Sequence, residues 1–186
     1  GVEAQFIEID WDNKFFELDS KAIDCIWNGM TITEEVQRNT SVSDPYVKNA
    51  QVVVMPKDTA EGYDAVELLQ GLRFAVEAGS AGEAAVKDLT GVTSTAVQSQ
   101  ASALMEVAAG TADACVIDIT MANAMTGPGT GYENLVIAME LSSEEYGIGF
   151  RKDSDLTQKV NGIMKDLMAD GTLDALAAKY SLTLVK

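Results

Sequence analysis

Residues 23–46 read IDCIWNGMTITEEVQRNTSVSDPY, and this stretch indicates how the rest of the chain is organised. It opens with a short apolar run, Ile23 to Trp27, whose length is typical of a buried strand. Gly29 ends the run, and Thr31 followed three residues later by Glu34 resembles a capping box that opens a helical turn. Because open α/β sheets bind ligands beyond the carboxyl ends of their strands, the groups after Gly29 are expected to form one side of a ligand site.

Composition restricts the class of protein. The 186 residues, 47% hydrophobic and 23% charged, fit one large globular domain or two small lobes. The net charge of -16 argues against nucleic acid or an anionic membrane as a partner, because both are polyanions. Strand and helix patterns alternate along the chain, which predicts an α/β fold with largely parallel sheets.

The pattern of elements begins again near residue 60. Ala4–Ile9 is expected to form the first strand, and the valine-rich run 51–55 a buried strand that ends at Pro56. A polar spacer follows, and from Tyr63 strands and helices alternate once more. This restart predicts a passage from one lobe to another.

Two turns carry candidate binding groups. Ser80 with Glu83 forms a capping box, and the helix amides of Ala81 and Gly82 would then point outward as an anion site. Asp118 follows a buried apolar run at the end of a strand, where its carboxylate could pair with an ammonium group. Each turn has a plainer interpretation as a capped helix start, and the residues alone leave both interpretations open.

Catalytic and metal chemistry have little support in the sequence. The chain contains no histidine, so a Cys/His metal cluster and a serine–histidine pair are both excluded. Cys25 and Cys115 each lie in an apolar run and are expected to be small buried hydrophobic residues, with a disulfide as the alternative. We therefore expect no catalytic residue, no metal site and no cofactor.

A resemblance to a known family extends over the whole chain. The strings IDCIWNGMTIT and SDPY, followed in order by QVVVMPKD and SSEEYGIGFRKDSDL, resemble the family 3 extracellular solute-binding proteins of ABC importers, close to the glutamine- and cystine-binding type. The resemblance implies an α/β, two-lobed, type II periplasmic-binding-protein-like fold. Its first lobe would comprise residues 1–57 and 146–186, and its second lobe residues 58–145.

The resemblance also implies a function. A polar or cationic amino acid would bind in the cleft between the lobes, and an ABC permease in the membrane would be the partner. The protein would work outside the cytoplasm, in the periplasm or as a lipoprotein at the outer face of the cell membrane, after removal of a signal peptide. The implied ligand-binding residues are Gly29, Thr31, Ser80, Ala81, Gly82 and Asp118.

Two positions depart from the family pattern. The first-lobe motif G-x-T-x-T-x-x-R ends in an arginine that clamps the ligand carboxylate, whereas this chain has Val36 there. An aliphatic side chain cannot replace a bidentate arginine, so amino acids are expected to bind weakly or not at all. Glu77 stands where the family often has a neutral or basic residue, and an acid there favours a cationic ligand.

A third departure concerns the beginning of the chain. Family members have a strand and a helix upstream of the segment that starts at Val2, so the first lobe is expected to be incomplete at its N-terminus. Either the chain is a fragment, or the strand comes from another copy in a strand-swapped homo-oligomer. The alternatives to an amino-acid receptor are a sensor or interaction module of the same fold without a ligand and, with less support, a dehydratase-like enzyme.

Overall fold

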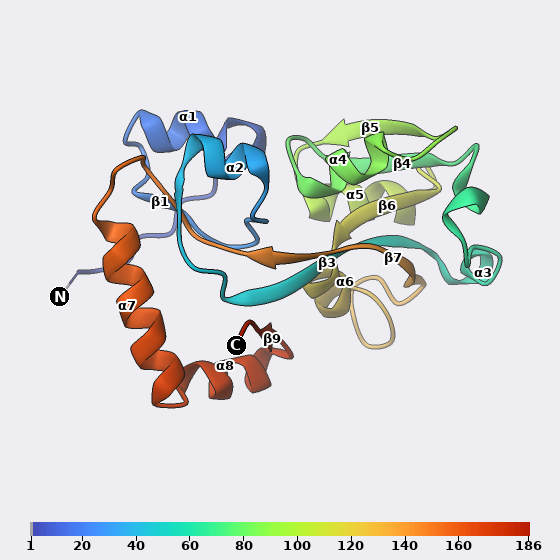
Figure 1. The fold of residues 1–186 in the computed structure, drawn as a ribbon. Coiled ribbons are helices and arrows are strands. Elements are labelled where there is room, and N and C mark those ends of the chain that lie inside the picture. Colours follow the sequence, from blue (N-terminus) through green and yellow to red (C-terminus); the bar gives the residue numbers. More distant parts are fainter. Residues whose placement is uncertain (1) are drawn as a thin grey trace.

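The computed structural model describes residues 2–186, which form two β-sheets, and a long two-stranded ribbon of the larger sheet extends towards the smaller one (Figure 1). The smaller sheet has the strand order β1-β8-β2, and the larger has the order β5-β4-β6-β3-β7, with β9 paired to β3. The strands are β1 (Cys25–Ile26), β2 (Ser41–Val42), β3 (Val47–Pro56), β4 (Arg73–Glu77), β5 (Thr93–Val97), β6 (Ala114–Asp118), β7 (Leu135–Tyr146), β8 (Gly149–Phe150) and β9 (Thr183–Leu184).

Helices surround both sheets. The α-helices are α1 (Lys14–Asp19), α2 (Glu34–Asn39), α3 (Lys57–Ala60), α4 (Ala81–Lys87), α5 (Gln100–Ala108), α6 (Ile119–Met125), α7 (Leu156–Ala169) and α8 (Thr172–Tyr180), and short 3-10 turns cover Trp11–Asn13 and Val66–Leu69. Among residues 2–186, no helix combines the length and the apolar character that a membrane crossing requires.

The larger sheet is the centre of the second lobe and is covered on both faces. Along β3, Val52 and Val54 pack into a core with α5, whereas Val53 and Met55 pack into a second core with α4. Successive strand side chains point to opposite faces, so a run of apolar residues buries both of them. The expectation of largely parallel sheets was wrong in part, since β4 pairs parallel with β5 and β6 but β3 pairs antiparallel with β6 and β7.

The ribbon of β3 and β7 connects the lobes. It pairs from Val47 with Tyr146 to Pro56 with Leu135, and Figure 1 shows both strands running between the two halves of the molecule. The structure differs here from the expected first boundary near Lys57. Residues 51–54 already pair with β6 of the larger sheet, so the chain passes between the lobes about where β3 begins.

The N-terminal segment does not form the expected strand. Residues 4–9 have no assigned secondary structure, and the side chains of Val2 and Phe6 are 99% and 96% exposed. In the described part of the chain, β1 pairs with β8 alone. An extended segment needs a hydrogen-bonded neighbour to become a strand, and none of the described residues supplies one.

Local capping differs from the sequence prediction at one helix. The N-cap of α2 is Thr33, whose hydroxyl accepts a hydrogen bond from the Val36 amide at 3.2 Å, so the helix does not begin at Thr31. The core beneath α2 in the first lobe consists of Leu18, Ile26, Met30 and Val36. Cys25 is half-buried and Cys115 is buried, and both are free thiols.

Candidate ligand-binding site

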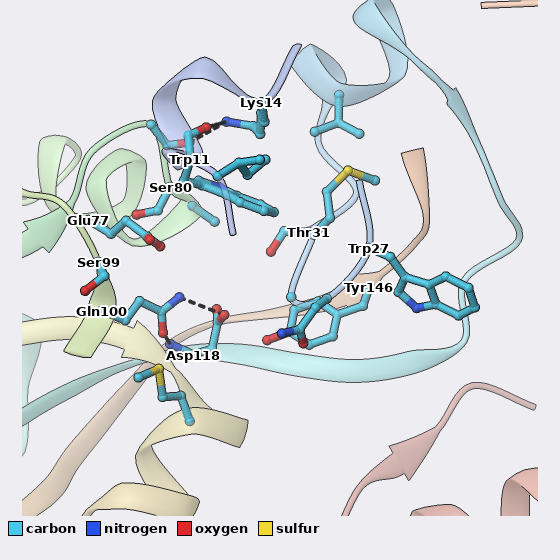
Figure 2. A pocket seen from close by; sticks show the side chains of 18 of the residues that line it. Trp11, Lys14, Trp27, Thr31, Glu77, Ser80, Ser99, Gln100, Asp118 and Tyr146 are labelled. Carbon is cyan, nitrogen blue, oxygen red and sulfur yellow. Dashed lines mark hydrogen bonds between the residues drawn. The ribbon is translucent and has the colours of Figure 1, made fainter. Parts of the chain in front are cut away.

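A cavity of about 630 Å³ lies between the lobes, within the size range of small-molecule pockets. Figure 2 shows Asp118 and Gln100 on one side of this cavity and Lys14, Trp11 and Ser80 on the other. The cavity lining includes five of the six residues proposed from the sequence: Gly29, Thr31, Ser80, Ala81 and Asp118. Their roles towards a ligand remain predictions.

Asp118 lies at the end of β6 and is only 6% exposed. Although it precedes α6, its side chain makes no capping hydrogen bond. Its Oδ1 accepts hydrogen bonds from Asn49 Nδ2 at 3.0 Å and Gln51 Nε2 at 2.5 Å, and its Oδ2 accepts one from Gln100 Nε2 at 2.8 Å. Three amide donors therefore hold the carboxylate in one orientation, with Oδ2 towards the cavity side occupied by Gly29.

Gly29 brings the first lobe up to this carboxylate. Its φ is +70°, and a Cβ built there would lie 3.4 Å from Asp118 Oδ2. The left-handed conformation favours glycine. A larger residue would therefore be strained and would crowd the acid. The two residues are 89 positions apart in the sequence, and only the folded chain brings them together.

Glu144 forms a second carboxylate centre beside Asp118. Its Oε1 accepts hydrogen bonds from Thr31 Oγ1 at 2.7 Å, Asn49 Nδ2 at 2.6 Å and Gln51 Nε2 at 2.7 Å. Since Thr31 uses its only proton on Glu144, its hydroxyl can meet a ligand only as an acceptor. The ligand contact expected for Thr31 therefore requires a donor group on the ligand. No local pattern in the sequence indicates this position of Glu144.

The turn between β4 and α4 forms the second-lobe side of the cavity. Ser80 Oγ accepts a hydrogen bond from the Glu83 amide, and Glu83 Oε2 accepts one from the Gly79 amide, both at 3.0 Å. The predicted capping of this helix is therefore present. Gly82 does not line the cavity, because it packs behind the turn, where an added Cβ would lie 2.8 Å from the Val116 carbonyl oxygen.

Lys14 was not anticipated from the sequence. The residue is 5% exposed, and its ammonium donates to the Gly79 carbonyl oxygen at 2.8 Å and to the Trp11 carbonyl oxygen at 3.2 Å. The ring centroids of Trp11 and Phe15 lie 5.2 and 4.9 Å from Nζ. Burial lowers the pKa of Lys14, and the nearby carboxylates of Glu35 and Asp12 oppose that shift. The sequence signal is its spacing of four residues from the buried Leu18 on α1.

The sequence model of the bacterial extracellular solute-binding proteins, family 3, matches residues 1–183. The chain belongs to this family. The family 3 chain is 29% identical to the arginine-binding extracellular protein ArtP of Bacillus subtilis over 185 residues, covering 97% of the chain and 71% of ArtP. It is 28% identical over 182 residues to the L-cystine-binding protein TcyJ of Escherichia coli K12, covering 97% of the chain and 68% of TcyJ.

Solved structures of amino-acid-binding proteins have a similar fold. A P235GK mutant of ArgBP from T. maritima superposes with a TM-score of 0.88 at 36% identity, and the match covers 97% of this chain and 78% of that one. The ancestral amino-acid-binding protein AncCDT-1 matches with a TM-score of 0.86 at 30% identity, and the match covers 97% of this chain and 78% of that one. AncCDT-1 is described as a precursor of cyclohexadienyl dehydratase. The resemblance identified from the sequence is thereby confirmed.

In this family 3 chain, the position of the expected arginine is part of the apolar core. Val36 is 4% exposed and packs with Leu18, Ile26 and Met30. Arg38 does not take its place, because its side chain is exposed and lies 4.0 Å from Glu34 on the outside of α2. Neither Val36 nor Arg38 of α2 therefore places a positive charge in the cavity.

Glu77 adds a second acid to the Asp118 side of the cavity. Burial, together with the nearby Asp118 carboxylate, raises its pKa to about 7, although a hydrogen bond with Gln100 and the charge of Lys14 oppose the shift. A cation placed beside such a carboxyl group would strongly stabilise its ionised form. Tyr146 closes this region, with its hydroxyl 3.1 Å from Thr120 Oγ1, and burial raises its pKa as well.

Proposed function

We propose that this chain is the extracytoplasmic substrate-binding component of an amino-acid ABC importer and that it binds a cationic amino acid in the cleft between its lobes. The observation that carries the proposal is the charge of the cavity. Among the described residues that line it, the acids are Glu8, Glu35, Glu77 and Asp118, and the only base is Lys14. An amino acid with a positively charged side chain is the class of ligand that compensates this excess.

The proposed contacts follow from the donors and acceptors around the cavity. The α-ammonium would donate to Asp118 Oδ2, with the Thr31 hydroxyl and the Gly29 carbonyl as further acceptors. The cationic side chain would lie near Glu77, which has no ion-pair partner within 4.0 Å in the described structure. Names of similar proteins support this assignment, since ArtP and ArgBP are both named for arginine.

A thermal-shift screen of the standard amino acids, followed by calorimetric titration of those that stabilise the protein, tests the proposal. Ligand binding raises the unfolding free energy by RT ln(1 + [L]/Kd), so the tightest ligand gives the largest shift. Arginine or lysine should give the largest shift. A larger shift with glutamine or cystine would indicate that the ligand is polar and uncharged in its side chain instead of cationic. No shift with any amino acid would favour a sensor or interaction module without a ligand.

The partner and location belong to the same proposal. The family is extracellular by its description, and relatives named as ABC transporter components support a membrane permease as the partner. We propose a location in the periplasm or, with a lipid anchor, at the outer face of the cell membrane. A strand-swapped homo-oligomer remains a further proposal, and sedimentation of the purified chain would test it.

A further inference from the structure

We propose that Lys14 supplies the positive charge that binds the α-carboxylate of the ligand, in place of the arginine that Val36 replaces. This inference rests on the proposed function of the cleft. It assigns a ligand contact to a residue that the family motif does not include. Lys14 is buried, donates hydrogen bonds to two carbonyl oxygens and lines the cavity between the two lobes.

The charge of Lys14 is buried without an ion-pair partner. The residue is 5% exposed, yet no carboxylate of the described residues lies within the 4.0 Å of an ion pair with its ammonium. Its two acceptors are the neutral carbonyl oxygens of Gly79 and Trp11. Buried lysines are almost always paired with an anion, so this site is incomplete without one.

The ammonium also has a donor to spare. A lysine ammonium carries three N–H groups, and the described structure gives acceptors to two of them. Lys14 lines the cavity and is the only basic residue of the lining. A carboxylate entering the cavity would accept the third hydrogen bond and would at the same time neutralise the buried charge.

The position of Lys14 matches both halves of a carboxylate site. On the second-lobe side, it binds the Gly79 carbonyl, directly before Ser80 and Ala81, whose turn lines the cavity. On the first-lobe side, Lys14 lines the same cavity as Glu35 and Val36 in the first turn of α2, and the charge of Glu35 opposes the lowering of the Lys14 pKa. Lys14 therefore shares one cavity with the α4 turn and with the position of the family arginine.

A different role for Lys14 would be purely structural. Its hydrogen bond to Gly79 joins α1 of the first lobe to the second lobe, so it could stabilise the closed cleft without touching a ligand. The two roles differ in what the ligand must contain. A carboxylate contact requires a ligand carboxylate, whereas a tie between lobes would affect every ligand that closes the cleft.

Calorimetric titration of arginine and of agmatine, which is arginine without its carboxylate, separates these roles. The variants are Lys14→Met, which keeps the apolar stem, and Lys14→Gln, which keeps a neutral hydrogen-bond donor. A charge-assisted hydrogen bond predicts that Lys14→Met weakens arginine binding by about 10- to 100-fold. Agmatine affinity should change by less than about 3-fold, because this ligand makes no contact with Lys14 through a carboxylate.

Each outcome decides the proposal. An equal loss for arginine and agmatine would overturn it and identify Lys14 as a tie between the lobes, and unchanged arginine affinity would overturn it outright. If the wild-type protein binds neither arginine nor lysine, the proposed function fails, and the wild-type titration shows this before any variant is made. If Lys14→Met does not fold, as judged by circular dichroism and ligand-free melting, Lys14→Gln provides the same comparison.

Discussion

Gln100 and Asp118 exchange two hydrogen bonds at the base of the cleft. Gln100 Nε2 donates to Asp118 Oδ2 at 2.8 Å, and the Asp118 backbone amide donates to Gln100 Oε1 at 3.0 Å. Because both ends of the Gln100 amide are used, its orientation is determined and the Asp118 carboxylate cannot rotate away from the cavity. This fixed acid is the group whose removal should affect ligand binding most directly.

Asp118→Asn should abolish measurable binding of a cationic amino acid, with a loss of about 100-fold or more in affinity. The change removes the negative charge and also places an NH₂ group against amide donors, so a melting temperature a few degrees lower is expected as well. Calorimetric titration measures the affinity. Asp113→Asn is the matched control, because Asp113 pairs with Arg73 on the surface. Equal affinity in Asp118→Asn and the control would refute the ammonium contact.

Glu77 should make ligand-free stability depend on pH. Its folded pKa of about 7 lies above the ordinary value of 4.5, so the folded state holds a proton that the unfolded state has already released. The stabilisation is complete below pH 4.5 and is lost as the pH rises through about 7. Glu77→Gln cannot lose that proton. The variant should therefore gain on the order of 1 kcal/mol relative to wild type between about pH 5 and pH 8, after discounting for solvent screening.

Melting curves of both proteins across this pH range measure the difference, which corresponds to about 2–4 °C. Binding should respond in the opposite sense, because an ionised Glu77 attracts a cationic side chain. Arginine affinity of the wild type should increase from about pH 6 to pH 8, and that of Glu77→Gln should not. Parallel pH profiles of the two proteins would contradict both parts of this prediction.

Gly82→Ala should destabilise the second lobe. An added Cβ would lie 2.8 Å from the Val116 carbonyl oxygen and 3.0 Å from Gln51 Oε1, so the α4 turn would have to move away from the sheet. Overpacking of this kind costs about 1–3 kcal/mol. Gly162→Ala in α7 is the control, because a Cβ there meets no atom within 4 Å and alanine favours a helix. Thermal denaturation curves should show a lower melting temperature for Gly82→Ala and an unchanged or higher one for Gly162→Ala.

Val36→Arg tests whether the apolar side chain at the family's arginine position limits binding. If Lys14 already provides the cation, Val36→Arg alone should raise arginine affinity by less than about 3-fold. The desolvation cost of a second buried positive charge offsets most of its attraction to the ligand carboxylate. In a Lys14→Met background the same change should restore most of the lost affinity, to within about 10-fold of wild type. Titration of the four proteins forms a double-mutant cycle. A large gain in the single variant would identify Val36 as the limiting feature instead.

Local rules were sufficient for several elements. The sequence predicted the buried strand that ends at Pro56, the Ser80 cap of α4 and the place of Asp118 at the end of a strand. Each depends on residues within a few positions, because capping hydrogen bonds and short apolar runs are properties of one short segment. The family motif then predicted which of these segments would face one another. The strand at residues 4–9 was wrong, because a strand depends on a neighbour that local sequence does not supply.

The tertiary structure decided the chemistry of the cleft. Lys14 contacts Gly79 across 65 positions, and Thr31 contacts Glu144 across 113. Neither pair leaves a local pattern, since both depend on how the β3–β7 ribbon sets one lobe against the other. The sequence by itself determined the two-lobed α/β fold and the candidate acids at its turns. Burial and long-range pairing determined which cation lies beside them, because the environment of a charge is a property of the assembled structure.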